Sequence, residues 1–568
     1  MNTQSRDIRL VHPQRLEAAL RQGLTGLEQD QIVRRIWSKD FTVWKPEDRE
    51  ITSRLGWLTA PETAVESIPE LEVFAGSVRG LGLTRAVILG MGGSSLAPEV
   101  FARLFPTGPS AVEIEILDTT EPGDVADAAA RFPAGKTLFV VSSKSGTTSE
   151  MIALLSFFYD RAVAELGDDH AGRRFVAVTD PGTPLEALAR ERHFRRVFLG
   201  RPDIGGRFSA LSAFGLLPAA LKGVDLHRLL APARDMARAC RVEKPEDNPG
   251  ALLGTILGVA ARSGLDKLTL LMPAHIRPFG SWLEQLLAES TGKEGRGIVP
   301  VVEDRPGPAA GYSRDRLFVE IGAPEAARAK SAAPRPEGTS SPLIGIPFEE
   351  PYDLAGHFFL WEFATAVAGR FIGVNPFDQP DVESAKKRTR EVLSSAGVKA
   401  PAAEPDRRPF SGGLRAGEPA PAGGDVEAAF KSLLAGRKEG AYLAILAFLP
   451  RSAAVEELLS GLAAGVRFET GLPVTVGFGP RYLHSTGQLH KGDGGHGLFL
   501  MLVAADLPGL AIPEFAGAKR PAADFGSLFK AQAEGDALAL TEKGRKVLTL
   551  ELSSPVEKGL ASLSSFLG

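Results

Sequence analysis

The stretch VVSSKSGTTSE, residues 140–150, places six hydroxyl side chains, a lysine and a glycine directly after an apolar run. Hydroxyl groups donate hydrogen bonds to phosphate oxygens, and exposed N–H groups at the start of a helix attract anions. A solvated, capped loop is the alternative, but capping needs only one of these hydroxyls. The stretch therefore predicts an anion site that uses Ser143, Lys144, Ser145, Thr147 and Thr148.

A second loop of this kind lies upstream, in VILGMGGSSLAPEVF at residues 87–101. Glycines permit positive φ angles and close backbone approach to a ligand, and Gly93 and Ser94 fall where the next helix begins. Residue 95 is Ser, which breaks the G-x-G-x-x-G fingerprint of dinucleotide-binding turns. The alternative is a plain strand-to-helix turn. Two such loops in succession favour phosphate binding.

Acid–base chemistry is indicated by SWLEQLLAESTGK at residues 281–293. Gln285 and Glu289 are spaced i, i+4 and share one helix face, so Glu289 is a candidate general base. The alternative is an exposed glutamate paired with Lys293. Arg207 follows a Gly-Gly pair in DIGGRFSALSAFG, where a guanidinium could stabilise a developing oxyanion or simply lie at the surface.

The segment NPFDQPDVESAKK, residues 375–387, holds Gln379 in a proline-rich turn and Lys386 in the helix that follows. A lysine on a solvated helix face is the alternative. Three histidines, at 484, 490 and 496, recur every six residues, which is not a usual metal-ligand spacing. The segment TGKEG has Glu where a nucleotide-binding P-loop needs Ser or Thr. No metal or organic cofactor is expected.

The elements that must position these residues are short β-branched runs separated by segments of helical length. Such runs lie at 86–90, 112–118, 136–143, 174–180 and 196–200, at 268–273, 297–303 and 317–322, and in four further strands after residue 440 around a helix at 452–464. This alternation predicts an α/β fold with doubly wound parallel sheets. Both hydroxyl-bearing loops then lie at carboxyl ends of strands, where open sheets bind ligands.

The domain organisation follows from changes in this pattern. Residues 1–60 are expected to form an N-terminal helical segment, because apolar residues between 13 and 56 recur at helical spacing. Two α/β domains are expected at 61–245 and 246–395. Residues 396–424, rich in Pro, Ala and Gly, are expected to be a linker, and 425–568 a C-terminal α/β domain.

Composition excludes several classes of protein. The chain has 568 residues and a formal net charge of −4, which does not call for nucleic acid or an anionic membrane as partner. Its one cysteine, Cys240, cannot form an internal disulfide. No apolar stretch approaches the roughly 20 residues that span a bilayer, and the N-terminus lacks the layout of a signal peptide. A cytoplasmic protein is expected.

Taken in order, these motifs resemble those of the glucose-6-phosphate isomerases, which have two sugar-isomerase (SIS) domains. GMGGSSLAP, SSKSGTTSE, GGRFSALSAFG, QLLAESTGK and NPFDQPDVESAKK are similar to the family's segments in the family's order, over roughly residues 60–395. The tail, with GFGPRYLHSTGQLHKGD, resembles the end of bifunctional transaldolase–isomerase proteins. About 60 residues before the first domain are too few for a transaldolase barrel, so that activity is not expected.

The resemblance implies roles for particular residues. Ser94, Ser143, Lys144, Ser145 and Thr148 would hold the sugar phosphate, and Gln285 and Gln379 would contact the substrate. Arg207 would stabilise an enediolate, Glu289 would move the proton between C2 and C1, and Lys386 would assist at the ring oxygen. The ring-opening histidine of the family is missing from its usual interval. His490 is the better substitute, and His357 is more typical of a structural histidine on a helix.

The expected function is therefore interconversion of glucose 6-phosphate and fructose 6-phosphate through a cis-enediol, with a small sugar phosphate as ligand. Two alternatives stay open: an isomerase that also accepts mannose 6-phosphate, and a sugar-phosphate sensor that binds without catalysis. The resemblance also implies a homodimer.

Overall fold

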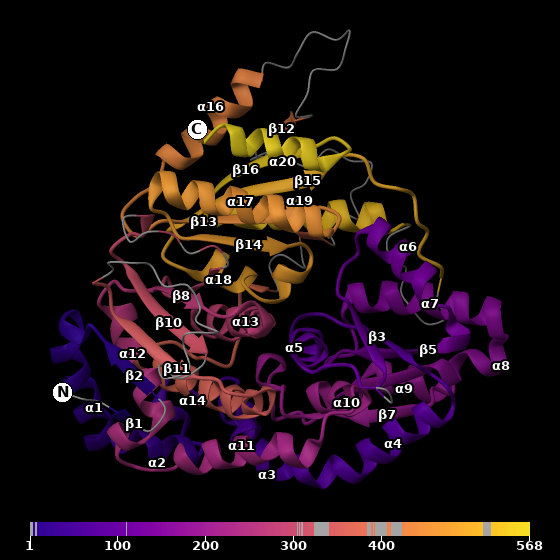
Figure 1. The fold of residues 1–568 in the computed structure, drawn as a ribbon, viewed down its shortest axis with the longest axis horizontal. Helices are drawn as coiled ribbons and strands as arrows, with labels where there is room; N and C mark the ends of the chain where they lie inside the picture. Colours follow the sequence, from indigo (N-terminus) through magenta and orange to yellow (C-terminus); the bar gives the residue numbers. More distant parts are fainter. Residues whose placement is uncertain are drawn as a thin grey trace.

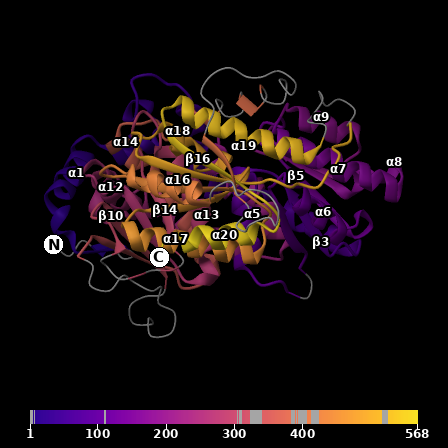
Figure 2. The same cartoon turned by 90° about the horizontal axis from the view of Figure 1, so that it is seen from above.

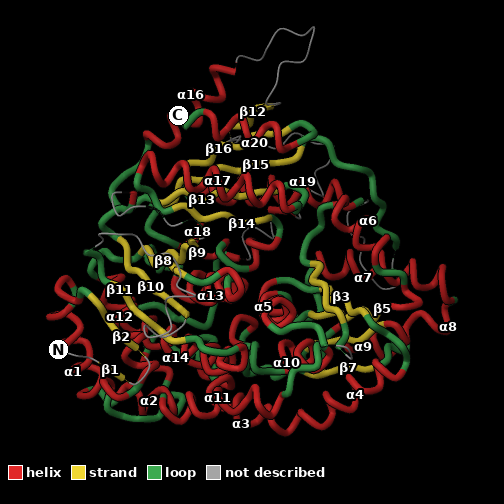
Figure 3. The backbone as a smooth tube through the Cα atoms, viewed as in Figure 1, coloured by secondary structure: helices red, strands yellow, loops and turns green. Residues whose placement is uncertain are grey.

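The structure is a computed structural model. It describes residues 4–5, 8–108, 111–303, 305, 307, 311–322, 340–382, 388–389, 391, 406–410, 423–514 and 524–567. The described chain forms three mainly parallel sheets with helices packed around them (Figures 1 and 3). The expected α/β class with parallel sheets is confirmed.

The first sheet has the order β4-β3-β5-β6-β7 and is parallel throughout. Its strands are β3 (Arg85–Leu89), β4 (Glu113–Leu117), β5 (Thr137–Ser142), β6 (Phe175–Thr179) and β7 (Arg196–Leu199). Its helices are α3 (Ala60–Thr63), α4 (Ile68–Gly80), α5 (Leu96–Leu104), α6 (Pro122–Arg131), α7 (Ser149–Leu166), α8 (Asp168–Ala171), α9 (Pro184–Glu191), α10 (Ala213–Leu221) and α11 (Leu226–Ala239).

Alternating strand residues of this sheet enter two separate cores. Ile88 and Val140 pack with α5 and α10, whereas Leu89 and Val141 pack with α6, α7 and α9. The chain thus leaves β3 towards one face through α5, and β5 towards the other through α7. Neighbouring strands whose connections diverge in this way define the point at which open α/β sheets bind ligands. Both hydroxyl-bearing loops begin there.

The second sheet has the order β1-β2-β11-β10-β8-β9. Strands β8 (Lys267–Leu271), β9 (Val299–Glu303), β10 (Arg316–Gly322) and β11 (Leu343–Pro347) are parallel. The same part of the chain contains three helices, α12 (Pro249–Arg262), α13 (Pro278–Thr291) and α14 (Leu354–Ile372).

The N-terminal segment differs from the expected purely helical one. It contains α1 (Glu17–Gln29) and α2 (Ile32–Trp37), but also β2 (Ile8–Val11) and β1 (Gln4–Ser5). Strand β2 pairs antiparallel with β11, so it extends the second sheet by main-chain hydrogen bonds. A four-residue strand is too short to be distinguished by periodicity, which explains why the sequence did not predict it.

The third sheet is parallel throughout, with the order β12-β16-β15-β13-β14. Its strands are β12 (Asp406–Phe410), β13 (Tyr442–Phe448), β14 (Val474–Phe478), β15 (Gly497–Ala504) and β16 (Lys546–Leu552). Its helices are α16 (Gly423–Ala435), α17 (Ala453–Thr470), α18 (Gly487–Gly492), α19 (Phe525–Glu542) and α20 (Val556–Ser565). Strand β12 falls inside the stretch expected to be a linker, and β11 of the second sheet was likewise not among the predicted strands.

The third sheet and its helices pack against both of the others. Phe525 and Leu528 of α19 belong to the core that includes α6 and α7, and Figure 2 shows this helix crossing the molecule. Arg481 forms ion pairs with Glu99 of α5 and with Asp118, which follows β4. These ion pairs hold the segment 479–493 against the first sheet's layer, and Leu489 of the same segment packs in one core with Ala288 of α13 and Val299 of β9. None of the described helices is both long and apolar enough to cross a membrane.

Candidate active site

Arg207 occupies the centre of the site and is almost fully buried, with 3% of its surface exposed. It lies in the short 3₁₀ turn η9 (Gly206–Phe208). Its Nε donates to Ser290 Oγ at 2.8 Å, and Nη1 donates to Gln379 Oε1 at 2.9 Å. Nη2 donates to the carbonyl oxygens of Pro376 and Asp378 at 2.7 and 3.0 Å. Four fixed acceptors leave the guanidinium no freedom to rotate.

Glu289 lies beside this guanidinium, near the end of α13. Its Oε1 is 3.4 Å from Arg207 Nη1, and Gln285 Nε2 donates to its Oε2 at 3.1 Å. The i, i+4 pairing predicted for Gln285 and Glu289 is therefore present. Gln285 Oε1 is buried and has no hydrogen-bond partner among the described residues, so it is available to a ligand.

The glycine loop after β3 fits against these residues with no space for a side chain. A Cβ atom on Gly93 would lie 2.0 Å from the carbonyl oxygen of Gly206. Gly92 has φ +56°, and a Cβ there would lie 2.9 Å from Gln285 Nε2. Glycine is required because the backbone of the short turn η6 (Gly92–Ser94) touches the turn that carries Arg207.

Gly93→Ala should displace the Arg207 turn. We expect at least a tenfold loss of turnover and a loss of about 1–3 kcal/mol in the free energy of unfolding, as is usual for overpacked sites. Gly206→Ala is the matched control, because a Cβ there meets no atom within 4 Å. Steady-state kinetics and urea unfolding of both variants test this, and equal losses in the two would contradict it.

The hydroxyl-rich loop joins β5 to α7 at the same edge of the first sheet. Ser143 Oγ lies 3.0 Å from Thr148 Oγ1 and accepts from the N–H of Gly146 at 3.1 Å. Ser145 Oγ lies 3.0 Å from Thr147 Oγ1. Gly146 has φ +67°, which turns the loop back on itself. These hydroxyls gather in front of the first turn of an 18-residue helix, an arrangement that suits an anion.

Lys144 has a different environment from the one expected. Its ammonium group forms an ion pair with Asp180 and donates to the carbonyl oxygen of Arg201 at 2.9 Å. It is therefore engaged by the segments that follow β6 and β7. The structure does not bring the lysine together with the hydroxyls, because a nearby carboxylate satisfies its charge.

A histidine that sequence reasoning did not select lies at the site. His484 ends the short turn η15 (Arg481–His484), and its Nε2 lies 3.0 Å from Oε1 of Glu150. Its carbonyl oxygen accepts from Gln285 Nε2 at 2.8 Å. Glu150, in the first turn of α7, also accepts from Gln532 Nε2 at 2.8 Å. Burial alone would raise the pKa of Glu150, but the interaction with His484 holds that pKa well below its usual value.

His490 is not at this site, which corrects the expectation from the sequence. It is 2% exposed and packs among Tyr442, Tyr482 and Phe499. Burial, together with Lys491, lowers its pKa far below the usual value. His484 lies six residues earlier, beyond the turn that precedes α18, and therefore faces the first sheet instead.

His357 is also outside the site. Its Nε2 bonds the carbonyl oxygen of Pro347 at 2.9 Å, and its ring contacts Phe279 and Phe348. Burial lowers its pKa. This is the structural role that its place on a helix suggested. Lys386, the remaining catalytic candidate, lies outside the described residues.

Lys293 holds the turn that carries Gln379. Its buried ammonium donates to the carbonyl oxygens of Asn375, at 2.7 Å, and of Asp378, and to Asp378 Oδ1 at 2.8 Å. The alternative prediction, an exposed ion pair between Glu289 and Lys293, is wrong, because Lys293 points to this turn. Burial first, and Arg207 second, lower the pKa of Lys293 to about 8.

This pKa gives Lys293 a measurable effect on stability. The unfolded chain keeps the Lys293 proton up to a pKa of about 10.4, whereas the folded chain loses it near pH 8. The unfolded state thus binds more protons between these values, so this group makes the free energy of unfolding rise with pH. Urea unfolding at several pH values should show a smaller rise for Lys293→Met than for the wild type. An unchanged slope would contradict the assignment.

Gln285, Glu289, Gln379 and His484 line a cavity of about 520 Å³. The residues that line it come from the N-terminal segment, the loop after β3, helix α13, the turn around Gln379 and turn η15. The cavity is lined by Arg49, Glu50, Arg54, Met91, Gly92, Gly93, Gln285, Glu289, Asp378, Gln379, Pro380, Val382 and His484. Among the described residues no group of three His, Cys, Asp or Glu side chains could hold a metal ion. The side chains present suit a polar, anionic ligand and a proton transfer beside an arginine.

Comparison with known proteins identifies the family. A family model described as "Phosphoglucose isomerase" matches residues 71–300. A glucose-6-phosphate isomerase of Rubrobacter xylanophilus is 30% identical over 439 residues, which cover 66% of this chain and 96% of that protein. The chain belongs to the glucose-6-phosphate isomerase family.

One further relative and two solved structures are also similar to this chain. A glucose-6-phosphate isomerase of Thermus thermophilus is 30% identical over 388 residues, covering 60% of this chain and 91% of that one. The crystal structure of hypothetical protein TT0462 from the same species has a TM-score of 0.55 and 26% identity, over 69% of this chain and all of that one. The glucose-6-phosphate isomerase of Chlamydia trachomatis shares the fold, with a TM-score of 0.53, 18% identity and coverage of 66% and 86%.

Several site residues of this family member gave only weak signals in the sequence. Glu150 is the last residue of the hydroxyl-rich stretch, and Lys293 is in the segment that fails as a P-loop. His484 belongs to a group of histidines that were considered as metal ligands. Arg49 and Arg54 lie in an N-terminal segment without a motif. The place of each of these residues at the site can be recognised only in the folded chain, where distant segments lie together.

Proposed function

We propose that this chain interconverts glucose 6-phosphate and fructose 6-phosphate through a cis-enediol intermediate, as an intramolecular aldose–ketose isomerase. The observation that carries the proposal is Glu289, held between the guanidinium of Arg207 and the amide of Gln285. A carboxylate in this position can take a proton from C2 of the aldose and return it to C1 of the ketose. Family membership supplies the substrate class.

Arg207 has the geometry of an oxyanion stabiliser. Its guanidinium is fixed by four hydrogen bonds before any ligand binds, so little reorganisation is needed as charge develops on the enediolate. Gln379 shares Arg207 Nη1 with Glu289. We infer that Gln285 and Gln379 orient the sugar hydroxyls on either side of this cation.

The phosphate is proposed to bind at the edge between β3 and β5. The hydroxyls of Ser143, Ser145, Thr147 and Thr148, with Gly93 and Ser94 of the neighbouring loop, supply the donors. Lys144 is proposed to hold this loop through Asp180 rather than to contact the phosphate directly. Lys386 keeps its proposed role at the ring oxygen, which rests on the sequence motif alone.

His484 is proposed as the group that moves the proton during ring opening, in place of His490. The support is its hydrogen bond to Glu150 and its place in the cavity wall. With Glu150 ionised, Nε2 carries the proton of that bond, and Nδ1 is left to exchange a proton with the substrate. Glu150 would act as a positioning residue, in the way that a carboxylate orients a histidine in other acid–base sites.

Turnover of fructose 6-phosphate by the purified chain, measured by coupled oxidation of the glucose 6-phosphate formed, tests the proposal. The same assay with mannose 6-phosphate tests for a dual isomerase. A chain that binds sugar phosphates without turnover would be the sensor, but Glu289 and Arg207 argue for catalysis because binding requires no base. A homodimer in the cytoplasm stays a prediction, which sedimentation and fractionation test.

A further inference from the structure

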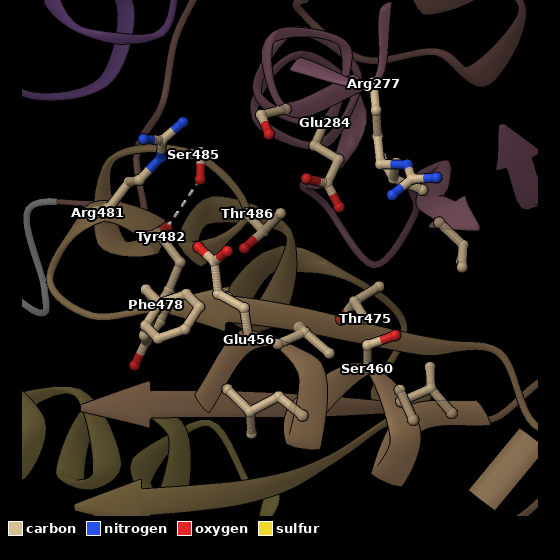
Figure 4. Close-up of a pocket in the computed structure, with 18 of the residues that line it drawn as sticks. Arg277, Glu284, Glu456, Ser460, Thr475, Phe478, Arg481, Tyr482, Ser485 and Thr486 are labelled. Carbon is tan, nitrogen blue, oxygen red and sulfur yellow. Dashed lines mark hydrogen bonds between the residues drawn. The ribbon is translucent and has the colours of Figure 1, made fainter. Parts of the chain in front are cut away.

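A second cavity lies behind the catalytic helix, at the seam between the second and third sheets. It measures about 260 Å³ and is lined by residues of α13, β9, α17, β14 and the segment that follows β14 (Figure 4). Arg277, Ser281 and Glu284 form its α13 wall. They are spaced i, i+4 and i+7, so they share one helix face, adjacent to the face that carries Gln285 and Glu289.

Most charges around this cavity are already compensated. Arg481 pairs with Glu99 and Asp118 in the first sheet's layer. Arg451 Nε lies 2.8 Å from Glu456 Oε1. These pairs hold the seam together and leave little charge for a ligand to neutralise.

Two groups on α13 are different, because neither has an ion-pair or side-chain hydrogen-bond partner among the described residues. Arg277 has a buried Nε without a partner, and Glu284 extends towards the third sheet (Figure 4). Seven residues of helix separate them by about 10 Å along the axis, so they cannot easily satisfy each other. A polar ligand between them would supply what each lacks.

The rest of the lining is rich in hydroxyl groups. Ser281, Ser460, Thr475, Ser485 and Thr486 contribute them, and His490, almost fully buried, has an Nδ1 with no hydrogen-bond partner among the described residues. Burial raises the pKa of Glu284 to about 8, although Arg481 opposes the shift. At neutral pH this carboxyl is therefore mostly protonated, and it can donate a hydrogen bond to a ligand.

We propose that this cavity binds a small hydroxylated anion, a phosphorylated or carboxylated polyol of about three or four carbons. The anionic group would pair with the guanidinium of Arg277, and the hydroxyls would bond Glu284 and the Ser and Thr side chains. At about 260 Å³ the cavity is slightly smaller than the roughly 300–1,000 Å³ of typical small-molecule sites, which limits the ligand to this size.

The same elements form this cavity and the catalytic seam. Turn η15 contributes Arg481 and Tyr482 to the cavity and His484 to the active site. Helix α13 contributes Glu284 to one and Glu289 to the other, and Gln285 Nε2 joins the two elements through the His484 carbonyl. A ligand that bridges α13 and the third sheet would thus regulate the isomerase by fixing this contact. The regulatory part rests on the proposed function, whereas binding does not.

A unique thiol in the cavity makes binding measurable without an activity assay. Cys240 is fully buried and is the one cysteine of the chain, so Ser460→Cys introduces a single accessible thiol. We expect glycerol 3-phosphate or D-glycerate to slow its alkylation by iodoacetamide several-fold and saturably, while uncharged glycerol has no effect. Protection by one anion and not the other identifies the anionic group, phosphate or carboxylate.

Second-site variants assign the protection to this cavity. Arg277→Gln in the Ser460→Cys background should abolish protection, whereas Ser145→Ala, in the proposed phosphate loop, should preserve it. Glu284→Gln, which keeps the shape of the side chain, should weaken protection and serves if Arg277→Gln does not fold. The proposal would be overturned if neither glycerol 3-phosphate nor D-glycerate changed the alkylation rate. Unchanged protection in both Arg277→Gln and Glu284→Gln would also overturn it.

The activity arm uses D-glycerate, which lacks a phosphate for the catalytic loop. It should change kcat/KM for fructose 6-phosphate in the concentration range that protects the thiol. Arg277→Gln should remove this response while basal turnover is kept. Protection without any change in turnover would support the binding site and reject the regulation. A chain without isomerase activity would still give the alkylation result, so the two failures are distinguishable.

Discussion

Glu289→Gln should lower kcat by roughly 10²–10⁴-fold, the usual contribution of a general base. Glutamine has the same shape and keeps a partner for Gln285, but it cannot accept the proton from C2. Binding of a phosphate-bearing competitive inhibitor should change little, because the proposed anchor is in the loops after β3 and β5. Exchange of the C2 proton of glucose 6-phosphate with deuterium oxide, followed by NMR, measures the abolished step directly.

Glu284→Gln is the matched control for this variant. It lies on the same helix, five residues away and on the face turned towards the third sheet, and it makes the same chemical change. Basal turnover should be close to that of the wild type. Comparable losses in the two variants would show that α13 tolerates no amide here and would contradict the assignment of the base.

His484→Asn should slow turnover of the cyclic substrate by roughly 10²-fold or more, as expected when an acid–base group is lost. The reason is that glucose 6-phosphate must open its ring before Glu289 can act. A four-carbon aldose 4-phosphate has no free hydroxyl with which to close a furanose ring. Its C2 proton exchange should therefore be largely spared in the same variant, which separates ring opening from proton transfer.

Two further variants complete this experiment. His490→Gln should retain turnover once folding is verified by circular dichroism, since the His490 side chain packs among aromatic rings and does not reach the cavity of Glu289. Glu150→Gln should reduce turnover less than His484→Asn, because it disturbs only the orientation of the histidine. Full activity of His484→Asn, with loss of activity in His490→Gln, would return the role to His490.

The sequence predicted the elements best where periodicity was long and the pattern uniform. The strands of the first sheet and β8, β9 and β10 were anticipated, because β-branched runs between helical segments admit few other folds. Strands β2, β11 and β12 were not, since each is short, and β2 and β12 pair with strands far away in the chain. Only tertiary contacts decide such pairings.

The site residues also differ in how far the sequence could predict their contacts. Gln285 and Glu289 could be paired from spacing alone, because both lie on one helix. His484 could not be paired with Glu150, since the two are more than 300 positions apart and no local pattern connects them. The sequence analysis favoured His490 as the substitute histidine, whereas the turn before α18 places His484 in the wall of the cavity that contains Glu289. Lys144 shows the converse: its loop could be placed at the sheet edge from the sequence, but the ion pair of Lys144 with Asp180 could not.

His484 is joined to its hydrogen-bond partner Glu150 through the same chain, so the two groups do not have to meet by diffusion. A group tethered in this way has an effective concentration set by the geometry of the chain and not by the amount of protein present. Specific activity should then be independent of dilution, even below the concentration at which any oligomer dissociates. On the proposed role of His484, the third sheet would then supply this group from within the same chain.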